Sequence, residues 1–554
     1  MKFGAGYGRA GRPEKLSTAT QRSWSIPQCR TNERDIMKRL RILLTYPEVP
    51  QTFWNLTHAL KFFGKRAWSP PLGLLTVAAM LPKEFELRLR DLNVESLRKD
   101  DLVWADYVFL SAMDVQRESS RQIIALCKEA GVKVVAGGPM FTSDPEAFRD
   151  VDHLILNEAE VTLPEFLHDL ETGNPKPRYA TTEFADATTS PLPAYQLLDP
   201  RGYGAMSVQF SRGCPYQCEF CDVTALFGRR PRSKTAAQII TELDNIYNRG
   251  WRGKIYFVDD NIMGSRPYLK KDLLPAIIEW KRNKRGMSFH TQITMNLADD
   301  QELIDLLYEA GFDWIFVGIE TPNEDSLAEC KKKQNLHRNL PEQIRYLQRC
   351  GLQIQAGFII GFDNDKPDIF HRQFELIQEN GVVMAMVSLL QAPKGTELYK
   401  RMEREGRLLG EYSANNVIDD TNVVMKCMER ETLRSGYRAL VRSLYQPKNY
   451  YERVRNFLAH YKEPKEQPPF TKEVFLAVVR CFFWLGLIRK GRFHFWRIFF
   501  WTCLHKRESV QNFLGLAILG YHFTKIHENM LSRSQPGSRR DSQTVPATPA
   551  LETA

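Results

Sequence analysis

Gly213-Cys-Pro-Tyr-Gln-Cys-Glu-Phe-Cys-Asp222 carries the clearest chemical signal in this 554-residue chain. It places Cys214, Cys218 and Cys221 in a C-x3-C-x2-C spacing, which supplies three thiolates. A structural zinc ion takes four closed ligands, so the run is one ligand short of a zinc site. A [4Fe–4S] cluster held by three thiolates keeps one iron open for a small molecule. The spacing therefore favours such a cluster; the alternatives are zinc with a distant fourth ligand, or three unrelated core cysteines.

On these residues the chain resembles the radical S-adenosylmethionine (SAM) superfamily, in which the open iron chelates the amino and carboxylate groups of SAM. The resemblance implies that Cys214, Cys218 and Cys221 are the cluster ligands and the centre of catalysis. It also implies that Phe220, the aromatic residue before the third cysteine, lies beside the adenine of SAM.

Working outward, a strand at 206–211 leads into the cysteine loop, and strands and helices alternate after it. Further strands are expected at 254–258, 288–295, 314–317, 355–360 and 384–390, with helices at 236–248, 273–283, 300–310, 340–350 and 367–380. Six βα units predict a partial (β/α)6 TIM-like barrel over about 204–400. Site residues of such barrels lie at the carboxyl ends of the strands.

Polar residues and glycines follow these strands in the order that the superfamily uses to contact SAM. The resemblance implies Asp259, Asp260 and Asn261 for the SAM amino group, Glu320 for the ribose, and Gly357 and Gly361 for the adenine. The alternative for the two aspartates is helix capping, and the alternative for the glycines is packing.

The amino-terminal region also alternates strands and helices. Strands are expected at 41–46, 86–92, 107–111, 132–136 and 153–156, with helices at 71–81 and 119–130. This pattern predicts an open parallel, flavodoxin-like (Rossmann-like) α/β sheet over about 37–175. Ligands of such sheets bind at the carboxyl ends of the strands.

Together with the cysteine motif, this region resembles the cobalamin-binding domain of class B type radical SAM methyltransferases. The resemblance is carried by the Pro-Pro-Leu-Gly segment ending at Gly73, the Gly137-Gly138-Pro139 turn and Asn157-Glu-Ala-Glu160. It implies cobalamin as a cofactor near Gly137, Gly138 and Glu158. The Asp-x-His-x-x-Gly motif is absent, which leaves the lower face of cobalt to water or to nothing. The alternative is a vestigial sheet that binds no ligand.

A proline-rich linker is expected at 176–203, and a helical carboxyl-terminal extension at 401–532. Within the extension, residues 474–488 are very apolar but are interrupted by Arg480 and are too short to span a membrane. Residues 489–501 interleave basic and aromatic side chains, which suits a membrane surface; the alternative is a helical layer that caps the barrel.

The two ends of the chain, 1–36 and 533–554, have the composition of a disordered leader and tail. Met37 is an alternative start, and a transit peptide is an alternative for the leader. Ten cysteines without a disulfide pattern favour the cytoplasm. The net charge of +10 comes with no nucleic-acid-binding module, so no nucleic-acid partner is expected.

The resemblance implies a cobalamin-dependent radical SAM methyltransferase that acts on an unactivated carbon through a 5′-deoxyadenosyl radical and methylcobalamin. The alternatives are a non-methylating oxidation, cyclisation or rearrangement, and a non-catalytic iron–sulfur or cobalamin-responsive regulator. The expected partners are a small-molecule or lipid substrate and an external electron donor such as flavodoxin or ferredoxin. Peripheral contact with the inner face of the membrane is expected through the carboxyl-terminal region. Hopanoids, tetrapyrroles, peptides and antibiotic scaffolds all stay open as substrates.

Overall fold

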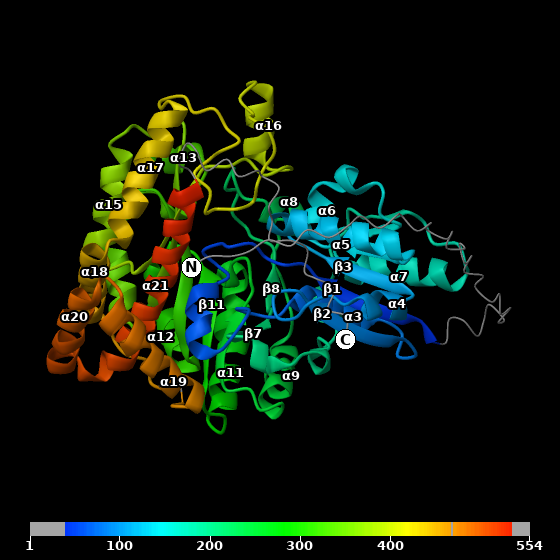
Figure 1. Ribbon diagram of the computed structural model, residues 1–554, viewed down its shortest axis with the longest axis horizontal. Helices are drawn as coiled ribbons and strands as arrows, with labels where there is room; N and C mark the ends of the chain where they lie inside the picture. Colours follow the sequence, from blue (N-terminus) through cyan, green and yellow to red (C-terminus); the bar gives the residue numbers. More distant parts are fainter. Residues whose placement is uncertain (1–38, 467–468, 534–554) are drawn as a thin grey trace, which may run out of the picture.

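Two parallel sheets stand side by side in the computed structural model, and a layer of helices covers the far side of the second sheet (Figure 1). The structure describes residues 39–466 and 469–533. The expected leader at 1–36, the alternative start at Met37 and the expected tail beyond residue 533 lie outside the described residues. The predicted fold class is confirmed, while the predicted domain boundaries stay a prediction.

The first sheet is parallel throughout, with the strand order β2-β1-β3-β4-β5-β6. Its strands are β1 (Arg41–Tyr46), β2 (Glu86–Asp91), β3 (Tyr107–Ser111), β4 (Lys133–Gly137), β5 (His153–Ile155) and β6 (Arg178–Tyr179). Its helices are α3 (Leu72–Met80), α4 (Lys99–Trp104), α5 (Arg117–Ala130), α6 (Pro139–Ser143) and α7 (Ala159–Glu171). The order changes direction between β1 and β3, which is where ligands of flavodoxin-like sheets bind.

The second sheet is also parallel, and its order β7-β10-β11-β12-β13-β14 follows the chain. Its strands are β7 (Ala205–Val208), β10 (Gly253–Phe257), β11 (Met287–Ile293), β12 (Phe312–Glu320), β13 (Gln353–Ile360) and β14 (Met384–Leu389). The helices between them are α9 (Ala236–Asn248), α11 (Leu274–Lys281), α12 (Gln301–Ala310), α14 (Leu340–Arg349) and α15 (Ile369–Glu379). This succession is the expected partial barrel.

The two faces of the second sheet differ in chemistry. On β12, Ile315 and Val317 are fully buried in the core, whereas Trp314 and Phe316 alternate with them and are half-buried on the inner face. The inner positions of the neighbouring strands are mostly polar: Lys254, Tyr256, Ser288, His290, Gln292, Gln353 and Gln355. The barrel interior is therefore lined by polar and aromatic side chains, while the outer face carries the apolar packing against helices.

The entry into the cysteine loop differs from the expected strand at 206–211. Strand β7 ends at Val208, and the next residues form β8 (Ser211–Arg212), which pairs antiparallel with β9 (Arg232–Ser233). The carboxylate of Asp259 accepts hydrogen bonds from the backbone N–H groups of Phe210 and Ser211, where the chain passes from β7 to β8. A side chain thus replaces the neighbouring strand as the hydrogen-bond partner, so the predicted single strand was wrong.

The carboxyl-terminal region is helical, as expected. Its helices are α16 (Glu397–Arg404), α17 (Arg430–Tyr445), α18 (Pro447–His460), α19 (Lys472–Cys481), α20 (Arg492–His505) and α21 (Val510–Arg533). The apolar run at 474–488 is divided between α19 and a π-helical turn, η12 (Phe482–Ile488). None of the helices within 39–466 and 469–533 combines the length and the apolar character needed to cross a membrane.

Helix α17 protects the edge of the barrel sheet. The hydroxyl of Tyr437 donates a hydrogen bond to the carbonyl of Val387, and that of Tyr445 donates to the carbonyl of Ala385. Both carbonyls belong to β14, the last strand of the sheet, whose outer edge has no strand partner among the described residues. The two hydroxyls satisfy carbonyl groups that would otherwise be open to strand addition.

The amino-terminal segment 47–63 leaves the first sheet and covers the barrel interior. It contains α2 (Thr57–Leu60) and packs against α21, with the ring centroids of Phe53 and Phe523 6.1 Å apart. Just after Phe53, the Trp54 ring meets Phe316 on the inner face of β12 at 4.6 Å. The two ends of the described chain therefore meet across the barrel.

Buried histidines make this contact between α21 and its neighbours sensitive to acid. His527 stacks on Tyr445 at 4.6 Å, and burial lowers the pKa of His522 and of His527 to about 3. Below the ordinary histidine pKa of about 6.5, the unfolded chain binds protons that the folded chain excludes. The free energy of unfolding therefore decreases as the pH is lowered. Each histidine should cost about 2 kcal/mol at pH 5.

We expect His527→Phe to reduce the fall in the thermal midpoint between pH 7 and pH 5, because it removes one proton-binding group from the unfolded chain. The exposed His371 offers the control, and His371→Gln should keep the wild-type fall. Differential scanning fluorimetry at the two pH values measures both. An unchanged fall in His527→Phe would show that this histidine does not titrate on unfolding.

Candidate active site

Two carboxylates after β10, the buried Asp259 and the half-buried Asp260, hold the start of the cysteine loop. Asp259 accepts hydrogen bonds from the backbone N–H of Phe210 (3.2 Å) and from the hydroxyl of Ser211 (2.6 Å). Asp260 accepts one from the backbone N–H of Gly213 (2.9 Å). Burial raises the pKa of Asp259 to about 7 and that of Asp260 to about 6. The structure thus places both carboxylates against the loop backbone, and their contact with SAM stays a prediction.

The three motif cysteines lie close together, and amide side chains approach two of them. The Nδ2 atom of Asn261 is 4.0 Å from the Sγ atom of Cys214, and the Nε2 atom of Gln334 is 3.4 Å from the Sγ atom of Cys218. Burial raises the pKa of Cys214 and of Cys221, and the nearby charge of Cys218 raises both further. Amide N–H groups aimed at the sulfurs suit thiolates, which accept hydrogen bonds.

This donor set suits a cluster better than a single ion. Within 39–466 and 469–533, no group of three or more His, Cys, Asp or Glu side chains is arranged to hold one metal ion. A cube of four irons spaces its thiolates more widely than one ion does, since each thiolate binds a different iron. Cys330 lies within the electrostatic range of Cys218, but its thiol donates to the carbonyl of Leu327 inside an apolar cluster. It offers no fourth zinc ligand.

A buried ion pair stands at the end of β12. The ammonium of Lys332 lies 2.6 Å from the Oε1 atom of Glu320, and both residues are buried. Burial lowers the pKa of Lys332, but the charges of Glu320, Cys218 and Cys221 raise it overall. Lys332 thus brings a positive charge to the site where the motif gathers thiolates.

The backbone around this pair is shaped to hold it. Glu320 has φ of 69°, which an L-residue rarely adopts and which costs about 1–3 kcal/mol. A Cβ atom on Gly318 would lie 2.2 Å from the Oε1 atom of Glu320 and 2.7 Å from the Nζ atom of Lys332. Gly318 is therefore required by the pair. The role of Glu320 toward the ribose stays a prediction.

Sequence reasoning missed Lys332 and Gln334. Lys332 is the middle residue of three consecutive lysines, a pattern typical of an exposed surface. Lys332 is buried, whereas its neighbours Lys331 and Lys333 are exposed. Only the position of Lys332 in the folded chain, next to the end of β12, makes the difference. No local signal in the sequence distinguishes them.

The two glycines expected to flank the adenine lie on β13 and directly after it. A Cβ atom on Gly357 would meet the Phe316 ring at 3.0 Å on the inner face. Gly361 has φ of 106°, and its Cβ atom would meet the Sδ atom of Met425 at 3.1 Å. The backbone conformation of Gly361 therefore favours glycine, and a side chain at position 357 would require the Phe316 ring to shift. The contact of both glycines with the adenine stays a prediction.

Phe220 lies between the second and third cysteines, with its ring beside the Lys332 ammonium. The ring centroid is 5.9 Å from the Nζ atom of Lys332 and 6.1 Å from the ring centroid of Phe362. The preceding residue, Glu219, receives hydrogen bonds from the guanidinium of Arg401 on α16 at 2.8 and 3.0 Å. This ion pair ties the cysteine loop to the first helix after the barrel, and the contact of Phe220 with the adenine stays a prediction.

At the carboxyl edge of the first sheet, the expected cobalamin residues have internal partners. A Cβ atom on Gly137 would lie 2.6 Å from the carbonyl oxygen of Ile155, and one on Gly138 would lie 2.8 Å from the Oγ atom of Ser111. These close approaches explain both glycines without a ligand. Their contact with cobalamin stays a prediction.

Glu158 lies in an ion-pair network between the sheets. Its carboxylate lies 3.0 Å from the guanidinium of Arg212 and 2.7 Å from that of Arg232, which belong to β8 and β9. Glu160 adds a second carboxylate 2.7 Å from Arg212. The network braces the first sheet against the base of the cysteine loop, a role that sequence reasoning did not identify; the predicted contact of Glu158 with cobalamin stays a prediction.

The carboxyl edges of the two sheets face each other. The Nζ atom of Lys394, after β14, lies 3.0 Å from the Oδ1 atom of Asp144, after α6. Asp222 of the cysteine motif, Asp114 after β3 and Tyr412 line the gap between the edges, which measures about 20 Å³. That volume holds about one water molecule, so a corrin ring would need the two edges to lie further apart.

Topology favours a cobalamin site at this edge. The loops after β1 and β3 meet at the change in strand order, where the Nε2 atom of Gln116 donates a hydrogen bond to the carbonyl of Pro47 (2.6 Å). Neither loop places a histidine at the gap, in keeping with the missing Asp-x-His-x-x-Gly motif.

Three family models match successive parts of the chain. A B12 binding domain matches residues 68–167, the radical SAM superfamily matches 208–384, and a domain of unknown function matches 396–535. These stretches coincide with the first sheet, the barrel and the carboxyl-terminal helices.

Curated and solved proteins resemble the whole arrangement. An uncharacterized methyltransferase of Synechocystis sp. is 37% identical, covering 93% of this chain and 99% of the relative. The hopanoid C-2 methylase of Rhodopseudomonas palustris is 32% identical, covering 87% of this chain and 92% of the relative. The cobalamin-dependent SAM radical enzyme OxsB, solved with aqua-cobalamin and SAM bound, has a TM-score of 0.56 at 16% identity, covering 92% of this chain and 82% of OxsB. The last likeness shows the fold.

We expect Lys332→Met to destabilise the barrel by about 3–5 kcal/mol, because it leaves the Glu320 carboxylate buried without its partner. The double variant Lys332→Met/Glu320→Gln should recover most of the thermal midpoint, since neither buried charge remains. Formation of 5′-deoxyadenosine should stay low in both. Lys333→Met, at the exposed neighbour, is the matched control. A double variant that forms deoxyadenosine at the wild-type rate would assign the pair a structural role only.

Proposed function

Because this chain belongs to the family of radical SAM enzymes that carry an amino-terminal B12-binding domain, we propose that it transfers a methyl group to an unactivated carbon of its substrate. The observation that carries the proposal is the meeting of the two carboxyl edges: Asp222 of the cysteine motif and Asp114 of the first sheet line the same gap. A donor held on one edge would then face a radical formed on the other.

The cofactors of this enzyme are a [4Fe–4S] cluster, SAM and cobalamin. When bound, they supply a 5′-deoxyadenosyl radical that removes hydrogen from the substrate and a methyl group that replaces it. Cys214, Cys218 and Cys221 would hold the cluster, with Asn261 and Gln334 donating hydrogen bonds toward two of the sulfurs.

The protein's own contribution is orientation and exclusion of water. Asp259 and Asp260 fix the loop backbone, so the thiols keep one arrangement. Tyr412 lies beside Asp222, in the gap between the edges. A closed site protects a reactive radical from side reactions.

The electron donor, the substrate and the location of the enzyme are proposed together with the reaction. An external one-electron donor, such as flavodoxin or ferredoxin, reduces the cluster, because the remaining cysteines show no spacing for a second cluster. The substrate is a small molecule, and the similarity to a hopanoid C-2 methylase supports a lipid. The enzyme works in the cytoplasm and contacts the inner face of the membrane through its carboxyl-terminal helices.

Replacing one cluster ligand tests the chemistry. We expect Cys218→Ala, reconstituted anaerobically with iron and sulfide, to form 5′-deoxyadenosine no faster than a control without enzyme. The wild type should hold about four irons per chain, and the variant should hold fewer. Cys427→Ala, at an exposed cysteine outside the motif, should behave like the wild type. Deoxyadenosine formed by Cys218→Ala at the wild-type rate would refute the cluster assignment.

The mass of the product separates methyl transfer from the alternatives. With SAM labelled by deuterium in its methyl group, we expect a product heavier than the substrate by one CD3 group in place of one hydrogen. Omitting cobalamin should abolish this product and leave slow deoxyadenosine formation. An oxidised or cyclised product without the label would refute methylation while leaving the radical chemistry intact.

A further inference from the structure

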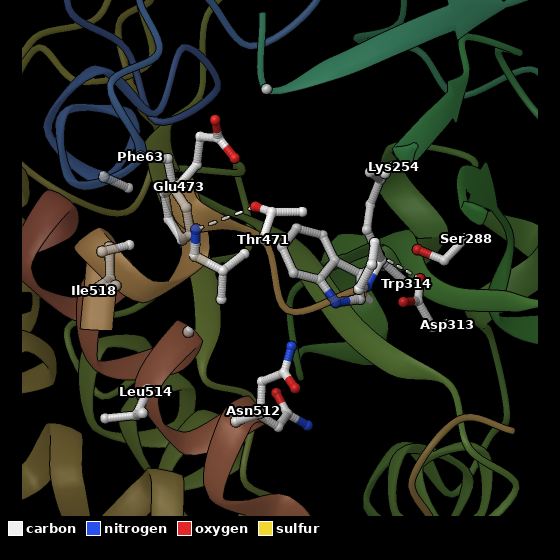
Figure 2. A pocket seen from close by; sticks show the side chains of 18 of the residues that line it. Phe63, Lys254, Ser288, Asp313, Trp314, Thr471, Glu473, Asn512, Leu514 and Ile518 are labelled. Carbon is white, nitrogen blue, oxygen red and sulfur yellow. Dashed lines mark hydrogen bonds and ion pairs between the residues drawn. The ribbon is translucent and has the colours of Figure 1, made fainter. Parts of the chain in front are cut away.

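A second cavity lies at the opposite end of the barrel from the cysteine loop. It measures about 420 Å³ and is bordered by the first residues of the strands, among them Gly253, Met287, Asp313 and Gln353. Figure 2 shows Trp314 and the Lys254–Asp313 pair on one side of it, with Leu514 and Ile518 of α21 on the other. Its volume is that of a site for a small organic ligand.

The walls of this cavity are largely apolar and aromatic. Trp68 and Trp314 stack with their ring centroids 6.2 Å apart, and both line it. Leu514 and Ile518 contribute from α21, while Gly515 between them exposes open space in place of a side chain. Such walls suit a hydrocarbon body.

The inner end of the cavity carries polar atoms without protein partners. Gln353 is 2% exposed, and neither its amide oxygen nor its amide nitrogen has a hydrogen-bond partner among the described residues. Buried polar groups are costly unless paired, so the Gln353 side chain is suited to hydrogen-bond a ligand.

Helix α19 separates the cavity from an unusual surface. Its residues Val474, Ala477 and Val478 line the cavity, whereas Phe475 and Val479 point outward and are exposed. Exposed apolar side chains continue along η12 and α20, which pack against each other. Helix α20 lies at the outer edge of the helical layer, next to α18 (Figure 1). The most exposed of these side chains are Leu487, Phe493, Phe500 and Leu504. We call this the α19–α20 surface.

Basic residues accompany the α19–α20 surface. Lys472, Lys490, Arg492 and Arg507 form no ion pair among the described residues, whereas the exposed acidic residues of these helices are only Glu473 and Glu508. An exposed apolar face with surrounding cations is complementary to a bilayer that contains anionic lipids, where apolar side chains enter the headgroup boundary and cations meet phosphate.

We propose that the enzyme docks on an anionic membrane through the α19–α20 surface and admits an uncharged amphiphilic lipid from it into this cavity. The lipid's apolar body lies against Trp68, Trp314 and α21, and its hydroxyl group meets Gln353. That this lipid is the methyl acceptor rests on the proposed function; the docking and the lipid site do not.

The distance to the radical site sets a requirement for the lipid. Asp313 borders the cavity, and Glu320 lies at the carboxyl end of β12, near the cysteine loop. The two residues are seven positions apart on the strand, or roughly 23 Å at about 3.3 Å per residue. The inner face between them carries the half-buried residues Tyr256, Phe316 and Gly357, and the Trp54 ring lies on Phe316. An extended lipid that bridges the two ends has to follow this face.

Docking is tested by co-sedimentation with vesicles of phosphatidylcholine containing a minor share of phosphatidylglycerol. We expect the wild type to sediment with them, and less so in high salt or with pure phosphatidylcholine. Leu504→Glu, at a residue 80% exposed, should weaken binding about tenfold or more, because it replaces an inserted apolar side chain by an anion. Val103→Glu, 79% exposed on α4, is the matched control and should bind as the wild type. A wild type that stays in solution, or an equal loss in both variants, would overturn the docking.

The lipid site is tested with dibrominated stearyl alcohol, whose bromine atoms quench tryptophan fluorescence on contact. We expect saturable quenching in the wild type and at least tenfold weaker binding in Gly515→Leu. The leucine fills the cavity without a clash at its Cβ atom and favours the helix over glycine, so folding is kept. Ala237→Leu, at an exposed position on α9 away from the cavity, is the control for an added side chain. Unchanged saturable quenching in Gly515→Leu would overturn the site.

Recognition of the hydroxyl is tested by comparing this alcohol with dibrominated octadecane. The wild type should prefer the alcohol by about threefold to tenfold, the value of one hydrogen bond, and Gln353→Leu should lose the preference while still binding the alkane. An equal preference in both proteins would refute the role of Gln353. These readouts need no SAM cleavage: lipid binding without deoxyadenosine would refute only the proposed function, and deoxyadenosine without lipid binding would refute only this inference.

Discussion

Burial of charge around the cysteine loop is the constraint on which the site depends. A loop that turns three thiols toward one point cannot keep a strand partner, so its N–H groups need other acceptors. Asp259 and Asp260 provide them, and burial raises the pKa of both carboxyls. Glu158 and Glu320 are compensated by cations from Arg232 and Lys332. Because each buried charge is costly alone, the loop, the two sheets and the end of β12 are stabilised together.

Local patterns predicted most of the fold. Apolar runs bounded by turns located the five long strands of the first sheet to within one residue, and the helices of the barrel to within two. What they missed depends on contacts between distant segments. The two-residue strand β6 is too short to carry a pattern, and the strand at 206–211 ends early because Asp259 captures its backbone. Of the site, the motif identified the cysteines, whereas Lys332 could not be found, because one buried lysine among three has no signature in sequence.

The glycines of the first sheet show how one residue type supports different interpretations. Gly137 and Gly138 were predicted to admit a ligand, yet both are required by neighbouring atoms of the first sheet. The contact that covers the barrel interior has no signal in the sequence either, since it joins Phe53 to Phe523 of α21, more than four hundred residues away. Such contacts form where apolar faces pack together in the folded chain. The sequence pattern of either segment alone does not predict them.

Lipid binding and radical chemistry are assigned to opposite ends of the barrel. Radical formation belongs to the carboxyl ends of the strands, where the cysteine loop lies, whereas the large apolar cavity belongs to the amino ends. Binding energy gained far from the reacting carbon can orient that carbon, because it restricts where the rest of the molecule lies. With a hydroxyl held at Gln353, the carbon that meets the radical is the one separated from it by the length of the barrel interior. Position along the lipid, more than intrinsic reactivity, then selects the carbon that is methylated.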